Sequence, residues 1–353
     1  MALHRAGSGV GGTVEIREKA AQLFTMADLV TPMAIRSAAE LRLADHLDKG
    51  PATVAEAAAG IGADTRALGV LLDHLDALGI VEADDAGRYS LAPLGEPLTS
   101  RWDHLGIRPR LDPTHISGRT EMAMTALVDT VRTGAAAYEA AHGDNLWNDL
   151  EDGAAGLDGA AEPAFAEAAF DAGLVVDSYD WSGVSTVVDV GGNDGALLQR
   201  LLTAHPHLRG VLFDLERSAR AARDRFRREG LADRAQAVAG SFFDSLPAGA
   251  DVYLLSAVLA DWNDEDCLRI LRNCARAAGP DGHVLVAEVH MRPPASSDPV
   301  ERTRTALWLE ASMERPDREV GDLEALARAA GTDIVRSGPH TSSRSLLVLR
   351  AGR

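Results

Sequence analysis

The residues whose types and spacing most clearly suggest chemistry form a glycine-rich turn with a carboxylate downstream. An aliphatic run that ends at Val190 leads into Gly191-Gly192-Asn193-Asp194-Gly195, and a helical pattern begins at Ala196. Glycines let the backbone turn sharply and approach a ligand at the positive end of the helix. A second aliphatic run ends in Asp214, 19 residues after Gly195, where a carboxylate accepts hydrogen bonds from both ribose hydroxyls of a nucleoside. We therefore expect a nucleoside-binding crevice, with a surface loop position as the alternative for Asp214.

NAD is the competing ligand for such a turn. The dinucleotide fingerprint is Gly-x-Gly-x-x-Gly, whereas Gly191 and Gly192 are adjacent here and Asp189 lies at the end of the strand. This spacing fits a mononucleoside with an amino-acid tail better than it fits a pyrophosphate.

The elements that would position these residues are short strands that alternate with helices. From residue 184 onward, β-branched or aliphatic runs recur between helical segments, at 186–190, 210–213, 235–238, 251–255, 283–289 and 345–349. Strands separated by helices imply parallel crossover connections, hence an α/β fold with a Rossmann-like doubly wound sheet. Ligands bind such sheets at the carboxyl ends of the strands.

The part before residue 100 is predicted to be mostly helical. Apolar residues recur at helical spacing over 23–47, the capping-box pattern Thr53-Val-Ala-Glu56 opens a short helix, and Asp64 caps another. The runs 80–82 and 88–91 flank a turn and predict a hairpin. Helix, turn, helix and hairpin together indicate a winged-helix plan.

Composition excludes several classes of partner. The 353 residues suffice for two or three domains, and the net charge of −18 argues against nucleic acid or an anionic membrane surface. The helix expected over 64–79 has one Arg, no Lys and three Asp, so we expect a dimerisation scaffold and no DNA reader. No apolar run is long enough to span a membrane, and the first residues resemble a frayed tail more than a signal peptide. Cys267 and Cys274 are expected to be free core thiols of a protein in the reducing cytoplasm.

Motifs along the chain resemble one enzyme family. Asp189-Val-Gly-Gly192 is followed by Phe213-Asp214, by Gly240-Ser-Phe-Phe-Asp-Ser-Leu-Pro247 and by Tyr253-Leu-Leu-Ser-Ala-Val-Leu-Ala-Asp-Trp262. In this order they resemble the class I S-adenosylmethionine-dependent small-molecule O-methyltransferases, in particular the bacterial secondary-metabolite branch with the anthracycline-type enzymes. Shorter matches extend the resemblance over nearly the whole chain, at 131–134, 140–143, 179–181 and 314–316.

The resemblance implies three regions. Residues 1–105 would form a winged-helix dimerisation domain, 106–180 a helical connector that lines the substrate pocket, and 181–353 the Rossmann-like domain that binds S-adenosylmethionine. The connector has Gly-, Asp- and Ala-rich interruptions over 151–162. A homodimer that takes a small-molecule acceptor is also implied.

The resemblance further implies which residues bind the cofactor. Asp189, Gly191 and Gly192 would lie at the methionine moiety and Asp214 would hold the ribose. Further residues expected around the cofactor are Leu215, Ser241 and Phe242 near the adenine, Ser256 near the methionine end, and Trp262 as a wall. Each could instead be an ordinary core residue, but their clustering after successive strands favours a site.

The sequence departs from the family at three positions. Ala260 stands where the family has the histidine that deprotonates the acceptor hydroxyl, Ser241 where a carboxylate contacts the adenine, and Asn193 where a third glycine is usual. Transfer without this base is physically reasonable, because alignment of the reactants contributes up to about 7–11 kcal/mol and a general base about 10²–10⁴-fold. Asp261 is then best placed to touch the acceptor.

Other groups are candidates for catalysis or acceptor binding. His290 shares a strand face with Glu288 and, together with Asp261, suggests a metal site; an exposed strand end is its alternative. Glu314 matches a family glutamate that supports the missing histidine. The candidates for the acceptor pocket, each of which could equally be structural, are His115, Tyr138, His142, Trp147 and Glu310.

The sequence therefore predicts S-adenosylmethionine-dependent O-methylation of a small aromatic or polyketide-like natural product. Carbon or nitrogen methylation is one alternative. Another is a hydroxylation, decarboxylation or rearrangement that uses the bound cofactor without transferring its methyl group. A DNA-binding regulator is the non-enzymatic alternative, which the acidic charge disfavours.

Overall fold

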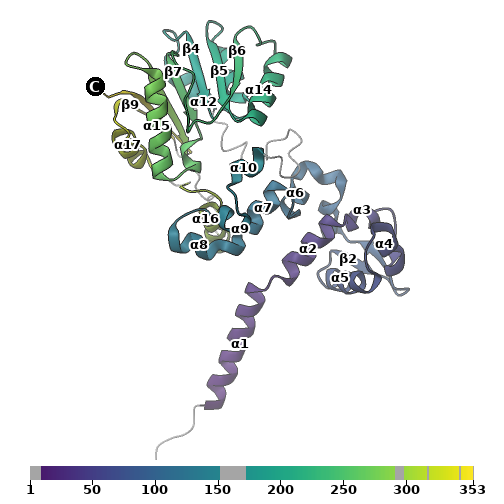
Figure 1. The fold of residues 1–353 in the computed structure, drawn as a ribbon. Coiled ribbons are helices and arrows are strands. Elements are labelled where there is room, and N and C mark those ends of the chain that lie inside the picture. Colours follow the sequence, from purple (N-terminus) through teal and green to yellow (C-terminus); the bar gives the residue numbers. More distant parts are fainter. Residues whose placement is uncertain (1–8, 152–171, 291–297, 316–317, 342, 353) are drawn as a thin grey trace, which may run out of the picture. The chain divides into compact units, whose positions relative to one another are not determined.

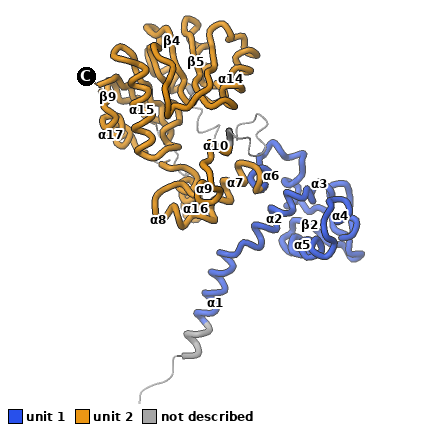
Figure 2. The backbone as a smooth tube through the Cα atoms, viewed as in Figure 1, with its two compact units in different colours: residues 1–112 blue, residues 113–353 orange. Residues whose placement is uncertain are grey.

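The chain consists of two compact units, residues 1–112 and 113–353 (Figure 2). They are seen in a computed structural model that describes residues 9–151, 172–290, 298–315, 318–341 and 343–352. Most of the Gly- and Asp-rich stretch expected over 151–162 lies outside the described residues. The division of the second unit near residue 180 stays a prediction.

The first unit has the helices and hairpin expected of a winged helix (Figure 1). The segment expected as helical over 23–47 is broken at Asp28 and again at Arg42, whose φ of 52° is left-handed. The elements are α1 (Gly9–Ala27), α2 (Val30–Glu40), α3 (Leu43–Leu47), β1 (Ala52–Thr53), α4 (Val54–Ile61), α5 (Thr65–Ala77), β2 (Val81–Ala83), β3 (Arg88–Leu91), two 3-10 segments η1 (Pro93–Leu98) and η2 (Ser100–Leu105), and α6 (Ile107–Leu111). Strand β3 pairs with both β1 and β2.

Local capping explains where these helices begin. The Thr53 hydroxyl accepts from the Glu56 N–H at 3.3 Å while the Glu56 carboxylate accepts from the Thr53 N–H at 2.8 Å, which confirms the predicted capping box. The Asp64 carboxylate caps α5 by accepting from the Ala67 N–H at 2.8 Å. The apolar face of α5 is buried as its spacing predicted, with Leu68, Leu72 and Leu75 at most 2% exposed.

The second unit begins with a cluster of short helices. These are α7 (Ile116–Met122), η3 (Ala123–Ala126), α8 (Leu127–Thr133), α9 (Ala137–His142) and α10 (Leu146–Glu151). Helix α16 (Pro299–Ser312) lies beside α8 and α9 although it is far along the chain (Figure 1). Its buried Ala311 packs with Ile116, Ala137 and Tyr138. The C-terminal part of the chain therefore helps to build this helical cluster.

A seven-stranded sheet fills the rest of the unit, in the order β6-β5-β4-β7-β8-β10-β9. Its strands are β4 (Thr186–Val190), β5 (Arg209–Asp214), β6 (Ala235–Ala239), β7 (Val252–Ser256), β8 (His283–Val289), β9 (Thr332–His340) and β10 (Arg344–Ala351). All six predicted strands are present, and those from β4 to β8 are parallel. The sequence did not predict β9, which lies antiparallel at an edge and buries only Thr332.

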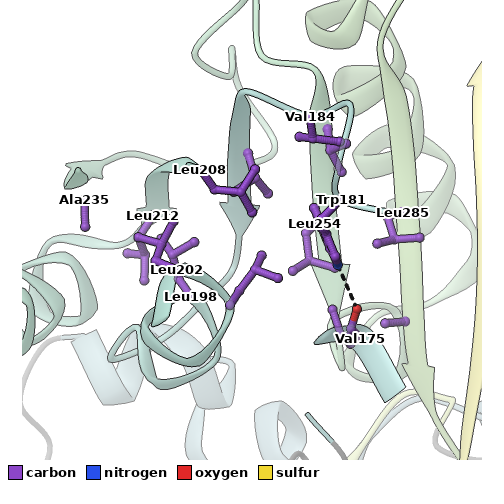
Figure 3. Packing of buried hydrophobic residues seen from close by; sticks show 14 of the residues in the cluster. Val175, Trp181, Val184, Leu198, Leu202, Leu208, Leu212, Ala235, Leu254 and Leu285 are labelled. Carbon is purple, nitrogen blue, oxygen red and sulfur yellow. Dashed lines mark hydrogen bonds between the residues drawn. The ribbon is translucent and has the colours of Figure 1, made fainter. Parts of the chain in front are cut away.

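Helices cover both faces of this sheet. Helices α12 (Ala172–Ser178), α13 (Ala196–Ala204) and α14 (Glu216–Arg228) pack on one face, and α15 (Asp264–Ala278) and α17 (Val320–Ala329) on the other. Figure 3 shows the first face, where Trp181 Nε1 donates to Val175 O at 3.2 Å beside Leu198, Leu212 and Leu254. The second face contains Cys267 and Cys274 as buried free thiols, as predicted.

The strand order makes β4 the point where doubly wound sheets bind their ligands. From β4 the chain adds strands first toward β6 and then, starting with β7, in the opposite direction, so β4 and β7 flank the point where the winding reverses. Val190 pairs with Phe213 on β5 and with Leu255 on β7. The residues that follow these strands therefore meet at one edge of the sheet. Within the described residues, no helix is both long and apolar enough to cross a membrane.

Candidate active site

The glycine turn after β4 has the tight geometry that its sequence predicted. Gly191 and Gly195 have φ of 73° and 79°, and Gly195 starts α13. A Cβ on Gly191 would lie 3.0 Å from Val258 Cγ2, and one on Gly192 would lie 2.4 Å from Asp189 Oδ2. Asn193 has a φ of 51°, which asparagine tolerates better than most residues. The missing third glycine is therefore replaced by a residue that keeps the left-handed backbone.

Asp214 faces the glycine turn. It ends β5, and its Oδ2 accepts from the Asn193 N–H at 2.8 Å while its Oδ1 accepts from the Leu215 N–H at 2.7 Å. Leu215 is half-buried where α14 begins. A carboxylate oxygen can accept more than one hydrogen bond. Asp214 can therefore also accept from ribose hydroxyls, and the surface alternative is wrong.

Asp189 is a buried carboxyl with no hydrogen-bond partner for either oxygen in the described structure. It is 0% exposed within β4. Burial raises the pKa of Asp189 to about 7, and the negative charge of Asp214 adds to the shift. A buried polar group without a partner is costly. A cationic amino group of a bound ligand would compensate it.

Three aromatic rings border the same edge of the sheet. The rings of Phe242 and Phe243 meet edge to face with their centroids 5.0 Å apart. The Trp262 ring centroid lies 5.7 Å from that of Phe242 and 4.7 Å from that of Phe243. Asn273 Nδ2 fixes the loop by donating to Phe242 O at 2.9 Å. The Ser241 hydroxyl accepts from the Phe243 N–H at 3.2 Å, so it shapes the loop where the family has a carboxylate.

Ala260 lies in the turn that follows β7, in an apolar environment. It is 1% exposed and packs with Val289, Leu309 and Met313. Asp261 follows it, and among the described residues no group hydrogen-bonds to its carboxyl. Burial raises the pKa of Asp261 well above its usual range, and the Glu288 carboxylate raises it further. The site thus has a carboxyl beside the position of the missing histidine.

His290 and Glu288 are both engaged in structural bonds. Glu288 is 0% exposed and accepts from the backbone N–H of Leu259 at 2.7 Å and of Val289 at 2.9 Å. Both ring nitrogens of His290 are occupied, Nδ1 by Arg318 O at 2.8 Å and Nε2 by Ser345 Oγ at 2.5 Å. No group of three or more His, Cys, Asp and Glu side chains in the described part could hold a metal ion. The hypothesis of a metal site at these residues is therefore wrong, as is an exposed His290.

Glu314 lies next to the backbone of Ala260. Its Oε1 accepts from the Ala136 N–H at 3.3 Å, and the Arg315 N–H donates to Ala260 O at 3.3 Å. Burial raises the pKa of Glu314 above its ordinary value. In the family this glutamate supports the imidazole of the histidine, but residue 260 is an alanine here, so Glu314 has no imidazole to support.

Tyr138 and His142 are joined in a polar cluster of the helical region. Tyr138 is 2% exposed; its hydroxyl donates to Asp149 Oδ2 at 2.7 Å and accepts from Arg119 Nε at 2.9 Å. Burial and the bond to Asp149 raise the pKa of Tyr138 to about 12. The His142 ring lies 4.6 Å from that of Tyr138, and its Nε2 contacts Arg119 O at 2.9 Å. These groups are occupied, so Tyr138 is unsuited to act as a base.

The other acceptor-pocket candidates differ in their surroundings. His115 Nδ1 caps α7 by accepting from the Ser117 N–H at 3.2 Å. Trp147 is half-buried at the start of α10, and Glu310 is exposed on α16. Their roles toward an acceptor stay predictions.

Two buried arginines were missed by the sequence reasoning. Arg344 is 0% exposed, and its Nη2 donates to the hydroxyl of Ser256 at 3.0 Å. Ser256 keeps its own proton and can still donate it. Arg318 is 1% exposed and contacts the turn after β7. Both contacts join residues far apart in the sequence, and no local signal could have found them.

The residues at this edge fit S-adenosylmethionine. Asp214 offers acceptors to a ribose, and Phe242 offers an apolar face to a purine. Asp189 supplies an uncompensated carboxyl for a cation. The arrangement therefore matches a nucleoside with a positively charged amino-acid tail.

Comparison with known proteins agrees with this geometry. Residues 124–333 match the model of an O-methyltransferase domain and residues 24–101 that of an O-methyltransferase dimerisation domain. The chain is 42% identical over 328 residues to the 2,7-dihydroxy-5-methyl-1-naphthoate 7-O-methyltransferase of Streptomyces carzinostaticus, covering 90% of this chain and 94% of that one. It is 40% identical over 277 residues to the aclacinomycin 10-hydroxylase of Streptomyces purpurascens, covering 75% and 71%.

A solved structure is similar over nearly the whole chain. This is an O-methyltransferase from neocarzinostatin biosynthesis in complex with S-adenosyl-L-homocysteine, with a TM-score of 0.75 and 40% sequence identity. The match covers 93% of this chain and 99% of that one.

Proposed function

The chain belongs to the O-methyltransferase family that joins an O-methyltransferase domain to a dimerisation domain, and from this premise we propose that it methylates a phenolic hydroxyl of a small polycyclic aromatic acceptor. The protein is an S-adenosylmethionine-dependent methyltransferase of the natural-product branch. When bound, the cofactor supplies an electrophilic methyl group. The acceptor class rests on the naphthoate named for the relative that is 42% identical.

The observation that carries this proposal is the position of Asp261 beside the buried, apolar Ala260. Val289, Leu309 and Met313 pack against Ala260 and form an apolar wall beside Asp261. The carboxyl of Asp261 offers one polar contact. One polar group in an apolar wall orients a flat ring while its hydroxyl points toward the cofactor.

Cofactor binding is assigned to the residues at the carboxyl edge of β4 and β5. Asp214 accepts from the ribose, the backbone at Gly191 and Gly192 passes close to the methionine part, and Asp189 faces the cationic tail. Trp262 and Phe242 exclude water from this side. Leu215, Ser241 and Ser256 complete the lining.

The acceptor proton leaves without an imidazole at position 260. A phenol has a pKa near 10, so the proton is lost during or before transfer. Burial raises the pKa values of the Asp261 and Glu314 carboxyls above their ordinary values, which makes either carboxylate a stronger base. Alignment of the reactants contributes the larger part of the barrier lowering, since correct placement is worth up to about 7–11 kcal/mol.

Product analysis tests the proposal. Incubation with S-adenosylmethionine and hydroxynaphthoates or anthracycline phenols is expected to release S-adenosylhomocysteine and a product with one added methyl group. Carbon-13 NMR of the product then distinguishes a methoxy carbon from a methyl on carbon or nitrogen. Failure to bind S-adenosylhomocysteine in calorimetry would contradict the cofactor assignment.

A second candidate function is hydroxylation. It is favoured by the 40% identity to an aclacinomycin 10-hydroxylase and by the absence of a histidine at position 260. The two reactions differ in product mass, because one adds a CH₂ unit and the other adds an oxygen atom. A product that gains oxygen and no methyl would replace the first candidate with this one.

We assign the first unit to homodimer formation in a cytoplasmic enzyme that binds no nucleic acid. Leu23, Phe24 and Met26 of α1 are 66%, 78% and 76% exposed in the single chain, which is unusual for apolar side chains and indicates a surface for a second copy. Light scattering of the native chain is expected to give a dimer, and Phe24→Glu is expected to weaken it. An equally stable dimer in that variant would contradict α1 as the interface.

A further inference from the structure

The turn that carries Asp261 is weakly fixed by its own backbone. This turn, η4 (Leu259–Asp261), has long internal bonds: the Asp261 N–H donates to Val258 O at 3.3 Å and the Trp262 N–H donates to Leu259 O at 3.3 Å. Ala257, just before it, has a φ of 56°, a left-handed conformation that disfavours any residue with a Cβ. Its conformation therefore depends on contacts from elsewhere.

Shorter bonds reach the turn from Arg318. The guanidinium donates from Nη1 to Leu259 O at 2.5 Å and from Nη2 to Trp262 O at 2.7 Å. Nη2 also donates to Asp264 Oδ1 at 2.7 Å, where the partner side chain is 56% exposed. The planar fork of arginine can hold two carbonyls at a fixed separation. Arg318 thereby bridges the start of the turn and the residue that follows it.

Glu288 binds the other polar backbone group of Leu259, its N–H. Its Oε2 accepts from the Leu259 N–H at 2.7 Å, and its Oε1 accepts from the Val289 N–H at 2.9 Å. Both polar groups of the Leu259 backbone are thus bound by buried, charged side chains. Because Glu288 lies in β8, the turn is tied to the sheet.

The backbone of Arg318 is itself anchored. His290 Nδ1 contacts Arg318 O at 2.8 Å, and its Nε2 contacts the hydroxyl of Ser345 at 2.5 Å. His290 follows β8 and Ser345 lies in β10. The guanidinium therefore reaches the turn from a fixed point.

We propose that Arg318 and Glu288 are positioning residues that hold the η4 turn so that Asp261 meets the acceptor in one orientation. This inference rests on the proposed contact between Asp261 and the acceptor. Without a histidine at position 260 the reaction depends on the alignment of the reactants. The side chains that fix the η4 turn therefore contribute more to the rate than they would in an enzyme with the histidine. Displacement of a reacting group by about 1 Å can cost about 10²-fold in rate.

We call the contacts of Arg318 and Glu288 with the η4 turn the clamp. Amide hydrogen exchange tests it in the absence of an acceptor. R318M and E288Q are compared with R328M as the matched control, since Arg328 is exposed and forms its ion pair with Glu324 inside α17. The amides of residues 259–262 are expected to exchange at least about tenfold faster in the first two variants, while those of β4 keep their rates. A general loss of packing would accelerate both regions.

Kinetics test the consequence for the reaction. In R318M and E288Q the acceptor KM is expected to rise and kcat to fall by about tenfold or more, while the Kd for S-adenosylhomocysteine stays within about threefold. R318K should recover part of both, because it keeps the charge and one donor. If R318M does not fold, R318K and D264N provide the same comparison with milder changes.

The outcomes separate this inference from the proposed function. Exchange rates at 259–262 and a KM equal to those of R328M would overturn the clamp. Wild-type enzyme that binds S-adenosylhomocysteine and methylates no hydroxyl would contradict the proposed function, whereas the exchange result would still report on the clamp.

Discussion

The backbone N–H of Asn193 donates to Asp214 Oδ2 at 2.8 Å, so the glycine turn of one strand and the carboxylate of its neighbour form a single unit. Asn193 reaches this carboxylate because its own φ is left-handed, at 51°. The position that departs from the family's glycine pattern therefore presents a backbone donor to Asp214, the carboxylate that we propose to bind the ribose.

Asp214→Asn is expected to weaken cofactor binding by about 10–100-fold. The amide would keep the shape but would lose the charge and one acceptor, and hydrogen bonds to charged groups contribute about 1.5–3 kcal/mol each. Calorimetric titration with S-adenosylhomocysteine measures the change. Asp244→Asn serves as a control because Asp244 is exposed on the loop after β6. Equal affinity in the two variants would contradict the role of Asp214.

Asp189 makes the stability of the free protein depend on pH. Its folded pKa of about 7 lies above its ordinary value of 3.8, so between these values the folded state binds more protons than the unfolded state. Stability must then fall as pH rises through this window, by up to about 1.4 kcal/mol per pH unit. Asp189→Asn is expected to reduce this slope by the contribution of Asp189, while Asp261 and Glu314, whose pKa values burial also raises, keep theirs. Urea unfolding at several pH values measures it.

The control for this prediction is again Asp244→Asn, which should leave the slope unchanged because this carboxyl is exposed. A wild-type slope that persists undiminished in Asp189→Asn would show that other groups cause it. A slope of opposite sign in the wild type would mean that Asp189 is compensated in the free protein.

The sheet and the cofactor edge could be predicted because their signals are local. The run from Val187 to Gly195 contains both the strand and its turn, and Asp214 follows the next strand at a short interval. Parallel pairing alone then brings these residues together. The predicted capping box at Thr53 is local in the same way.

The support of the site could not be predicted because it depends on contacts between distant segments. Arg318 binds a turn 59 residues earlier, and Arg344 reaches Ser256 across 88 residues. His290 was expected to be exposed or to bind a metal, yet packing of β10 against β8 brings Ser345 to its ring. Charged residues usually signal the surface, so buried arginines leave no pattern in one sequence.

Tyr138→Phe is expected to lower stability and to leave the pH dependence of the reaction unchanged. The hydroxyl joins Arg119 and Asp149, which remain paired at 2.6 Å without it, so the loss should be about 1 kcal/mol. Asp149→Asn should cost more, because Arg119 would lose its counter-charge. Thermal unfolding and a pH–rate profile check both statements. Loss of the rise in rate with pH in Tyr138→Phe would instead identify this hydroxyl as a base, because a base becomes active as it loses its proton.

Ala260→His is expected to reduce both stability and rate. Ala260 is 1% exposed among Val289, Leu309 and Met313, so an imidazole must displace packed side chains, at a cost of about 1–3 kcal/mol. Its nitrogens would also enter an apolar environment that disfavours their charged form. The melting temperature and the pH–rate profile are compared with those of Ala260→Ser, which adds a polar group with far less volume. A faster enzyme with a new titration near the pKa of histidine would show that the pocket still accepts the family's base, and that this chain has lost only its side chain.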